Sequence, residues 1–201
     1  MIQIVRANKV NNVRKDISKL FVNSFYYIFS SFCNDKNKLE KAFNHIFALS
    51  LFYVVLLDNK VIGIGACSDG SSSIHFNKFK LCVHLGFKRG NAMYKYLKSI
   101  FEDRDYDFDM DNMCGMIEFV AVDSNYLNSN IGYILVNHMM HDNKYIRYLA
   151  KVANNNYRGI KLFEKIGFEE FHKENASSRE MGDFGVTNYI YYIYSKWGKL
   201  C

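Results

Sequence analysis

The sequence has no proline and no Cys-x-x-Cys pair among its 201 residues. Its five cysteines show no metal-ligand spacing and lie at positions 33, 67, 82, 114 and 201. We therefore expect reduced, mostly buried thiols and no metal site. The missing proline, alongside abundant Asn, Lys, Ile and Tyr, indicates a bias in the coding sequence, and we infer no function from it.

Long apolar runs are missing too, since the apolar stretches stay well below the roughly 20 residues that a membrane-spanning helix needs. Met1 to Val5 starts a strand pattern directly, without a basic-then-apolar leader. We therefore expect a soluble, cytoplasmic protein with no membrane partner. With 49% apolar residues, the chain is long enough for one well-buried domain over 1–201 and too short for two.

Charge of one sign does not dominate either. Lys and Arg number 26 against 20 Asp and Glu, which gives a net charge of +6 that looks scattered along the chain. This balance suits an anionic cofactor and equally a generic basic surface. No basic stripe with interleaved aromatics stands out, so nucleic acid is not an expected partner.

The Asp-rich run Asp103–Asp111 invites comparison with a calcium loop. Counting from Asp107, Asn112 stands where such a loop needs glycine, and Glu118 at the twelfth position belongs to a predicted strand. We therefore expect a solvated linker here.

Residues 116–132 predict a buried strand, a loop of small polar residues and the start of a helix. After the loop, apolar residues recur at helical spacing, at Ile131, Leu135, Val136, Met139 and Met140. Backbone N–H groups at a helix N-terminus favour an anion, because the peptide dipoles align there. This layout indicates a pyrophosphate site, although an ordinary strand-loop-helix corner has the same pattern.

Residues 145–168 predict an alternating strand, an Asn-rich cap and a short amphipathic helix. Asn156 is the expected N-cap and Gly167 the expected terminator. Ile160, Phe163 and Ile166 form the apolar face of this helix.

Together these two segments resemble the acetyl-CoA-binding segments of the GNAT superfamily of N-acetyltransferases. The family pattern Asn-x-x-Ala-x-x-Leu-Tyr-Glu-Lys-x-Gly-Phe is matched in spacing at Asn156, Gly159, Leu162, Phe163, Glu164, Lys165, Gly167 and Phe168. The resemblance implies an α+β fold: a mixed, mostly antiparallel sheet of about seven strands with helices on both faces. It also implies that the sheet splays between the fourth and fifth strands.

The loop departs from the family pattern Arg-Gly-x-Gly-x-Gly, because only its last glycine is kept. The chain has Leu127, Asn128, Ser129, Asn130, Ile131 and Gly132 at these positions. Asn is among the few residues besides Gly that enter left-handed backbone conformations, so Asn128 and Asn130 are expected to keep the loop shape. Losing the Arg removes one charge-assisted contact, and we expect weaker cofactor affinity.

The resemblance implies acetyl-CoA as cosubstrate. The backbone of Val120, Ala121 and Val122 would pair with its pantetheine arm. The backbone of residues 127–133, which ends at Tyr133, would hold its pyrophosphate. Asn156 would reach its thiol end or its pantetheine amides. Phe163 stands where many relatives place a tyrosine beside the sulfur, so the usual proton donor is missing.

Elsewhere the pattern predicts a strand at 2–5, helices over 10–29 and 36–49, and a hairpin of 51–57 with 61–67. An insertion over about 75–112 is expected to form helices at 78–85 and 91–101 and to wall the substrate cleft. It resembles a GNAT subgroup with a helical pair after the third strand. The last strands are expected at 169–173 and 188–194, joined by a polar loop.

Transfer to an amine needs a base, since an alkylamine with a pKa of roughly 10 is mostly protonated at neutral pH. Glu118, a carboxylate amid apolar strand residues, is the predicted catalytic or substrate-binding residue, with a structural salt bridge or a solvent-facing carboxylate as the alternatives. His75 and His84 are weaker candidates for a base. Cys67 and Cys114 lack the context of a nucleophile. Hydroxyl donors are sought among the tyrosines at 157, 189, 191, 192 and 194.

We therefore expect an N-acetyltransferase acting by direct attack of a primary amine of a small molecule or peptide, as a monomer or homodimer. A GNAT-fold module that binds CoA or regulates a partner is the first alternative. A protein N-terminal acetyltransferase is the second. Lys151 argues against it, because some of those enzymes carry an acidic residue at that position.

Overall fold

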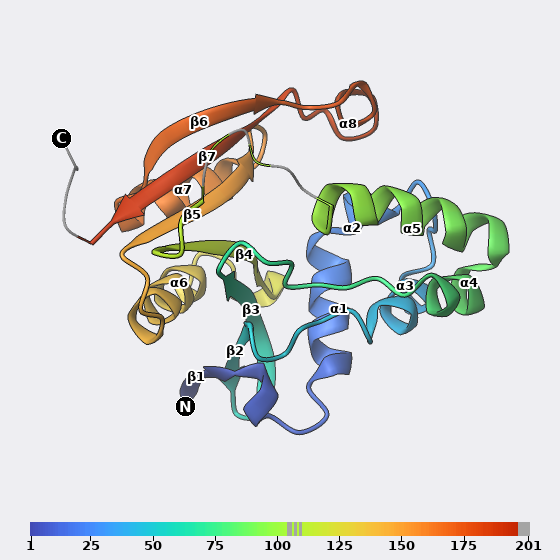
Figure 1. Ribbon diagram of the computed structural model, residues 1–201. Helices are drawn as coiled ribbons and strands as arrows, with labels where there is room; N and C mark the ends of the chain where they lie inside the picture. Colours follow the sequence, from blue (N-terminus) through green and yellow to red (C-terminus); the bar gives the residue numbers. More distant parts are fainter. Residues whose placement is uncertain (104–105, 107, 109, 197–201) are drawn as a thin grey trace.

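The computed structural model describes residues 1–103, 106, 108 and 110–196. One sheet of seven strands has the order β1-β2-β3-β4-β5-β7-β6 (Figure 1). Its strands are β1 (Ile2–Arg6), β2 (Phe52–Leu57), β3 (Lys60–Ser68), β4 (Cys114–Val122), β5 (Arg147–Ala153), β6 (Glu169–Asn175) and β7 (Asn188–Ser195). Among the strand pairs of the described residues, only β4–β5 is parallel. The predicted mixed, mostly antiparallel sheet is confirmed.

Helices cover both faces of this sheet (Figure 1). The chain before β4 forms α1 (Arg14–Ser24), α2 (Tyr26–Phe29), α3 (Lys36–Phe43), α4 (Lys78–Leu85) and α5 (Phe87–Phe101). These helices share a phenylalanine-rich core that includes Phe21, Phe43 and Phe52. On the other face, α6 (Ile131–Asp142) and α7 (Tyr157–Ile166) pack on a second core with Leu135 and Met139.

The sheet splays at its parallel pair. The register of β4 with β5 runs from Cys114↔Arg147 to Ile117↔Ala150 and stops there. Both strands continue, because β4 still pairs with β3 at Val122 and β5 still pairs with β7 at Ala153. The β5-facing edge of residues 118–122 therefore opens into a gap, as the resemblance implied.

A β-bulge in β4 lies where the gap begins. Between the pairs Ala66↔Glu118 and Ile64↔Ala121, β4 advances by three positions and β3 by two, so β4 contains one extra residue. Phe119 takes φ 52°, a strained value for a bulky residue. Its ring packs against those of Phe21 and Phe101 at centroid distances of 5.5 and 5.4 Å, and this packing stabilises the bulge.

The bulge also changes which face each side chain occupies. Ile117 packs with the α6–α7 core, Phe119 and Ala121 pack with the phenylalanine-rich core, and Val120 packs again with the α6–α7 core. Glu118 therefore projects from the same face as its neighbour Phe119, whereas regular alternation would put them on opposite faces.

Several predicted elements hold with shifted ends. The hairpin turn is confirmed at Asp58 and Asn59, whose φ values of 49° and 65° suit a two-residue turn. The helix predicted over 36–49 ends at Phe43, because Phe47 forms a bridge to Ile74 instead. The helix predicted over 10–29 is broken at Phe25 into α1 and α2.

The insertion contains its two predicted helices, but α5 begins at Phe87 instead of residue 91, so Gly86 alone separates it from α4. The loop predicted between the last strands contains α8 (Ser178–Phe184), which the prediction missed. A capping box of Ser177 with Glu180 starts α8, and Gly185 at φ 65° ends it.

Some predictions lie partly outside the described residues. Of the Asp-rich run, Arg104, Asp105, Asp107 and Asp109 are not described, and neither is Cys201. In the described part of the chain, no helix has the length and apolarity to cross a bilayer. The same residues include no group of three or more His, Cys, Asp or Glu side chains placed to hold a metal ion.

Candidate active site

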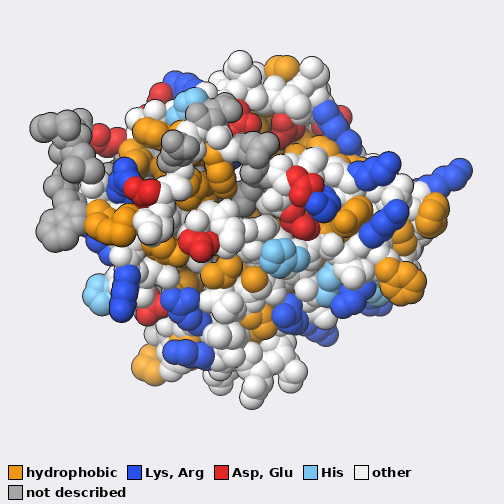
Figure 2. All heavy atoms as spheres, in the orientation of Figure 1, with side chains coloured by type: hydrophobic (Ala, Val, Ile, Leu, Met, Phe, Trp, Pro, Cys, Tyr) orange, Lys and Arg blue, Asp and Glu red, His pale blue; other side chains and the backbone are white. Residues whose placement is uncertain are grey.

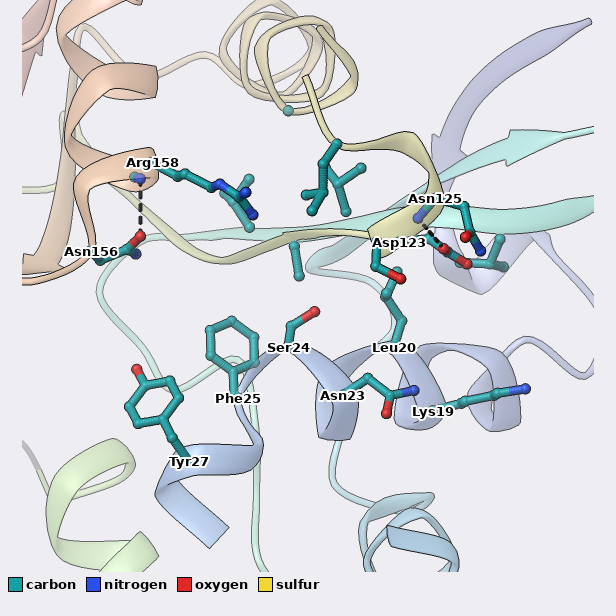
Figure 3. A pocket seen from close by; sticks show the side chains of 18 of the residues that line it. Lys19, Leu20, Asn23, Ser24, Phe25, Tyr27, Asp123, Asn125, Asn156 and Arg158 are labelled. Carbon is teal, nitrogen blue, oxygen red and sulfur yellow. Dashed lines mark hydrogen bonds between the residues drawn. The ribbon is translucent and has the colours of Figure 1, made fainter. Parts of the chain in front are cut away.

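A cleft of about 1420 Å³ opens beside the splayed end of β4. Figure 3 shows one wall built by α1, with Lys19, Leu20 and Asn23 facing Asp123 across the opening. Near the other end, Phe25 and Tyr27 face Asn156. The cleft is therefore bounded by helices of one face and by the start of α7 on the other.

The predicted pantetheine-binding segment lies in this cleft. Val120, Ala121 and Val122 all line it. Their strand has lost its β5 partner at this point, so its edge is available to an extended ligand that pairs with it as an added strand.

The loop after β4 has the backbone shape that its asparagines predicted. Asn128 and Asn130 take φ values of 63° and 61°, in the left-handed region. Asp123 starts the loop by accepting a hydrogen bond from the Asn125 N–H at 3.0 Å, which caps the short helix η2 (Ser124–Tyr126). The prediction that Asn128 and Asn130 adopt the left-handed conformation that glycine usually supplies in this loop is confirmed.

This loop and α7 enclose a second, smaller cavity of about 240 Å³ next to the main cleft. Its lining contains the predicted pyrophosphate-binding residues Leu127, Asn128, Asn130, Ile131, Gly132 and Tyr133. Ser129 is the exception, and its hydroxyl donates to the Tyr126 carbonyl. The first turn of α6 thus faces a cavity of a size that suits a small anionic group.

Three cations of α7 line the same small cavity, and they were not predicted from the sequence as a group. They are Arg158, Lys161 and Lys165. Lys165 Nζ donates to Asn130 Oδ1 at 2.9 Å and lies 5.1 Å from the Tyr133 ring centroid. The i, i+3, i+7 spacing of these residues, which puts them on one helical face, was the signal available in the sequence. The positive charge missing at Leu127 is thus supplied by the neighbouring helix.

Asn156 both caps α7 and lines the main cleft. Its Oδ1 accepts the Gly159 N–H at 3.0 Å and caps α7, and its side chain also lines the main cleft. The predicted helix ends are confirmed, since Gly167 ends α7 at φ 102°.

Two predicted site residues lie away from both cavities. Phe163 is 5% exposed and packs on Phe168 with ring centroids 5.0 Å apart, inside the α6–α7 core. Glu118 is half-buried and accepts a hydrogen bond from Ser73 Oγ at 2.9 Å. Glu118 lies two residues before Val120, the first β4 residue in the cleft wall.

None of the five candidate tyrosines, at 157, 189, 191, 192 and 194, lines either of the two cavities. Tyr189 donates to Glu180 and Tyr191 donates to Glu174, at 2.8 and 2.7 Å, and Tyr157 points outward with 71% exposure. Tyr27 is the tyrosine that lines the cleft within the described residues. Partial burial, with a smaller effect of Glu180, raises the pKa of Tyr27, so its hydroxyl keeps its proton at neutral pH.

The cysteines are unsuited to nucleophilic chemistry. Burial raises the pKa of Cys67 to about 12 and that of Cys114 to about 11, and neither lines the cleft. Both therefore stay protonated thiols at neutral pH.

The prediction that the helical insertion walls the substrate cleft stays a prediction. No described residue of α4 or α5, and neither His75 nor His84, lines either cavity. Part of the wall of the main cleft comes from α1, α2 and α8, with Tyr27 of α2 meeting Phe184 of α8 at a ring-centroid distance of 5.7 Å. Arg179 holds α8 near α5, because its guanidinium lies 4.2 Å from the Tyr96 ring centroid.

A family model described as "Acetyltransferase (GNAT) family" matches residues 15–168, which include both motifs. No curated protein matches the chain in sequence.

Solved structures share its fold at low identity. An N-acetyltransferase from Staphylococcus aureus Mu50 is 16% identical, covers 96% of this chain and 100% of its own, and has a TM-score of 0.59. The ribosomal-protein-S18-alanine N-acetyltransferase from Escherichia coli is 11% identical, covers 97% and 94%, and has a TM-score of 0.54. The IAA acetyltransferase from Bacillus cereus ATCC 14579 is 12% identical, covers 97% and 98%, and has a TM-score of 0.52.

Proposed function

The chain belongs to the acetyltransferase (GNAT) family, and from this membership we propose that it is an acetyl-CoA-dependent N-acetyltransferase of a small-molecule or peptide amine. One observation carries the proposal. The open edge of β4 leads directly into a loop and helix N-terminus that face three cations across a small cavity. An extended, amide-containing chain ending in phosphates fits this sequence of groups.

Acetyl-CoA would lie along β4 with its amides paired to the backbone of Val120–Val122. Its pyrophosphate would lie between the backbone N–H groups of residues 127–133 and the side chains of Arg158 and Lys161. Asn156 also lines the cleft and would contact the pantetheine arm or the thiol end. The thioester would then lie near the bulge in β4.

In the proposed reaction, the neutral amine attacks the thioester carbonyl carbon directly. The C–N bond forms, the C–S bond breaks, and the amine nitrogen loses a proton. Glu118 would accept that proton, directly or through a water molecule, because it is the strand carboxylate next to the bulge. Tyr27 would give the departing thiolate a proton, because its hydroxyl is protonated at neutral pH and it lies in the cleft wall.

The test is a thiol-release assay with acetyl-CoA and a panel of primary amines. We expect release that depends on one class of amine. Glu118→Gln should lower kcat strongly at neutral pH and less at high pH, where the amine loses its proton unaided. An equal loss at every pH would reject Glu118 as the base.

The first alternative is a GNAT-fold module that binds CoA without turnover. The non-glycine loop and Phe163 motivate it. If acetyl-CoA raises the melting temperature while no amine is acetylated, this alternative is correct. If acetyl-CoA at high concentration leaves the melting temperature unchanged, the cofactor assignment fails.

A protein N-terminal acetyltransferase is less favoured. Lys151, at the position where some of those enzymes carry an acid, is bound to Glu174 at 2.7 Å and does not line the cleft. Peptides with free N-termini in the amine panel test the hypothesis of N-terminal acetylation directly.

A further inference from the structure

The α4–α5 helix pair has no place in the proposed reaction, and its surface has an unusual composition. Residues 70–101 contain six Lys and Arg residues and no Asp or Glu. The chain as a whole has 26 basic and 20 acidic residues, so the rest of the chain is neutral by formal charge. The net charge of +6, which looked scattered along the sequence, belongs entirely to this segment.

Most of these cations are free on the surface. Lys78, Lys80, Lys88, Arg89 and Lys95 are exposed. No carboxylate in the described part of the chain forms an ion pair with any of them. The sixth, Lys98, pairs with Asp103. Figure 2 shows the resulting surface at the α4–α5 end, where blue and orange side chains adjoin.

The apolar side chains on this surface project outward. Phe79, Val83 and Phe87 are 76%, 62% and 75% exposed. Phe79 and Val83 are one turn apart on α4. Phe87 starts α5, and its backbone lies beside α4, because Cys82 Sγ donates to the Phe87 carbonyl oxygen at 3.7 Å. Leu81 and Leu85 of the same helix are buried in the core, so the outward apolar residues do not belong to the packing of the fold.

The helix pair holds this surface in a fixed shape. A Cβ atom at Gly90 would lie 2.6 Å from Cys82 Cα, so only glycine permits the close contact between α5 and α4. Gly86 at φ 82° makes the turn between them. The stripe of Phe79, Val83 and Phe87 is therefore presented by a rigid corner of the molecule.

We propose that the α4–α5 corner binds the surface of an anionic lipid bilayer, with Phe79, Val83 and Phe87 entering the headgroup region and the surrounding Lys and Arg contacting lipid phosphates. An interface of this kind combines an apolar layer with negative charge, which is the complement of this surface. The phosphates of a nucleic acid would pair with the cations, but a nucleic acid offers no apolar layer for the aliphatic side chain of Val83. An acidic protein would have to supply a separate apolar pocket.

This inference is independent of the proposed reaction. No described residue of α4 or α5 lines the cleft, so membrane binding would place the enzyme at a lipid surface while leaving the cleft accessible. The proposal departs from the sequence-based expectation of no membrane partner, which rested on the lack of a membrane-spanning run, because no helix is required to cross the bilayer.

The test is co-sedimentation of the full-length chain with vesicles. We compare phosphatidylcholine alone with vesicles containing roughly one third phosphatidylglycerol. We expect binding to the anionic vesicles only, weakened by added salt because charge contributes. Phe79→Ser with Phe87→Ser, and separately Lys88→Glu with Arg89→Glu, should each lower the partition coefficient at least tenfold.

Matched controls make the same chemical changes elsewhere. Lys9→Glu with Lys15→Glu reverses two exposed cations outside the segment, and Phe171→Ser removes an exposed ring on β6. Both should bind vesicles as the unchanged chain does. If the charge reversal at 88 and 89 impairs folding, as judged by circular dichroism, Lys88→Gln with Arg89→Gln gives the same direction of effect.

Equal binding to both vesicle types, or binding to neither, would overturn the proposal. Retention of binding in the Phe79 and Phe87 double variant would overturn it too. If single-stranded RNA binds instead and loses binding in the same variants, the surface belongs to nucleic acid and the lipid assignment is wrong. Each of these results leaves acetyl-CoA binding to be measured separately, so they are distinct from a failure of the proposed reaction.

Discussion

Two basic regions of this molecule differ in shape more than in charge. Arg158, Lys161 and Lys165 of α7 face inward over a cavity of about 240 Å³, opposite a loop of backbone N–H groups. The cations of α4–α5 face outward around exposed phenylalanines. The first arrangement fits a compact anion held from several sides, and the second fits a broad charged surface.

Charge alone thus identifies neither ligand. The two regions differ in the groups that adjoin the cations. Backbone N–H donors of the loop before α6 lie across the cavity from the α7 cations, whereas apolar side chains surround the α4–α5 cations. Changes that affect one region should leave the other function intact, and the following variants test that separation.

The largest effect is expected from removing the α7 cations. Arg158→Ala with Lys161→Ala deletes two charge-assisted phosphate contacts, each worth roughly 1.5 kcal/mol. The acetyl-CoA dissociation constant should therefore rise about 100-fold. Isothermal titration calorimetry measures this change. The matched control, Lys95→Ala on α5, should leave acetyl-CoA affinity unchanged, and a similar loss in that control would refute the assignment of α7.

The next effect concerns the other region. Gly90→Ala places a Cβ atom 2.6 Å from Cys82 Cα, and overpacking of this kind costs about 1–3 kcal/mol. We expect a lower melting temperature and weaker vesicle binding, with acetyl-CoA affinity nearly unchanged.

Gly182→Ala in α8 is the control for this glycine, because a Cβ atom there meets nothing within 4 Å. A helical alanine should stabilise slightly at such a position. Should Gly90→Ala weaken acetyl-CoA binding as much as vesicle binding, the two regions are not independent.

A smaller effect is expected in the loop. Asn128 at φ 63° tolerates a conformation that alanine adopts only at a cost of about 1 kcal/mol. Asn128→Ala should therefore weaken acetyl-CoA binding about fivefold. Asn128→Gly should bind at least as well as the unchanged chain. If both variants bind equally, the left-handed conformation is not what the ligand requires.

The smallest effect is a pH dependence under the α4–α5 corner. Burial, with Lys80, His84 and Arg14 nearby, lowers the pKa of His45 to about 4. Its neutral Nε2 accepts the Asn77 N–H at 3.1 Å and so fixes the start of α4.

Because the folded pKa of His45 is below the unfolded value of about 6.5, the neutral ring stabilises the fold fully above that pH. This contribution is lost as pH falls from 6.5 through 4. His45→Gln should show a smaller drop in melting temperature over that range. Acetyl-CoA affinity should not follow this titration, since His45 lies outside both cavities.

The sequence predicted the parts that local chemistry determines. Asn156 and Gly167 lie at the two ends of α7, and Asn128 and Asn130 adopt positive φ values. Both features were predictable because helix capping and the left-handed conformation depend on the residue type at a single position. The start of α8 could have been predicted in the same way from the capping box of Ser177 and Glu180. The polar composition of this segment led instead to the prediction of a loop.

The parts that depend on distant contacts were not predictable in this way. Helices α1, α2 and α8 supply part of the wall of the main cleft, and only the packing of the folded chain brings them together there. Phe163 lies in the core and Tyr27 lies in the cleft, although both are aromatic residues on short helices. The +6 charge of residues 70–101 could have been counted, but its meaning depends on which side chains face outward.

The bulge at Phe119 makes β4 unequally sensitive to deletions of single codons. Because Phe119 is the extra residue against β3, deleting it would restore regular alternation and leave Ile117 and Val120 on their present face. Deleting Ile117 or Ala121 instead would shift the rest of the strand to the opposite face. The position of a one-residue deletion in β4 therefore decides which core the following side chains enter.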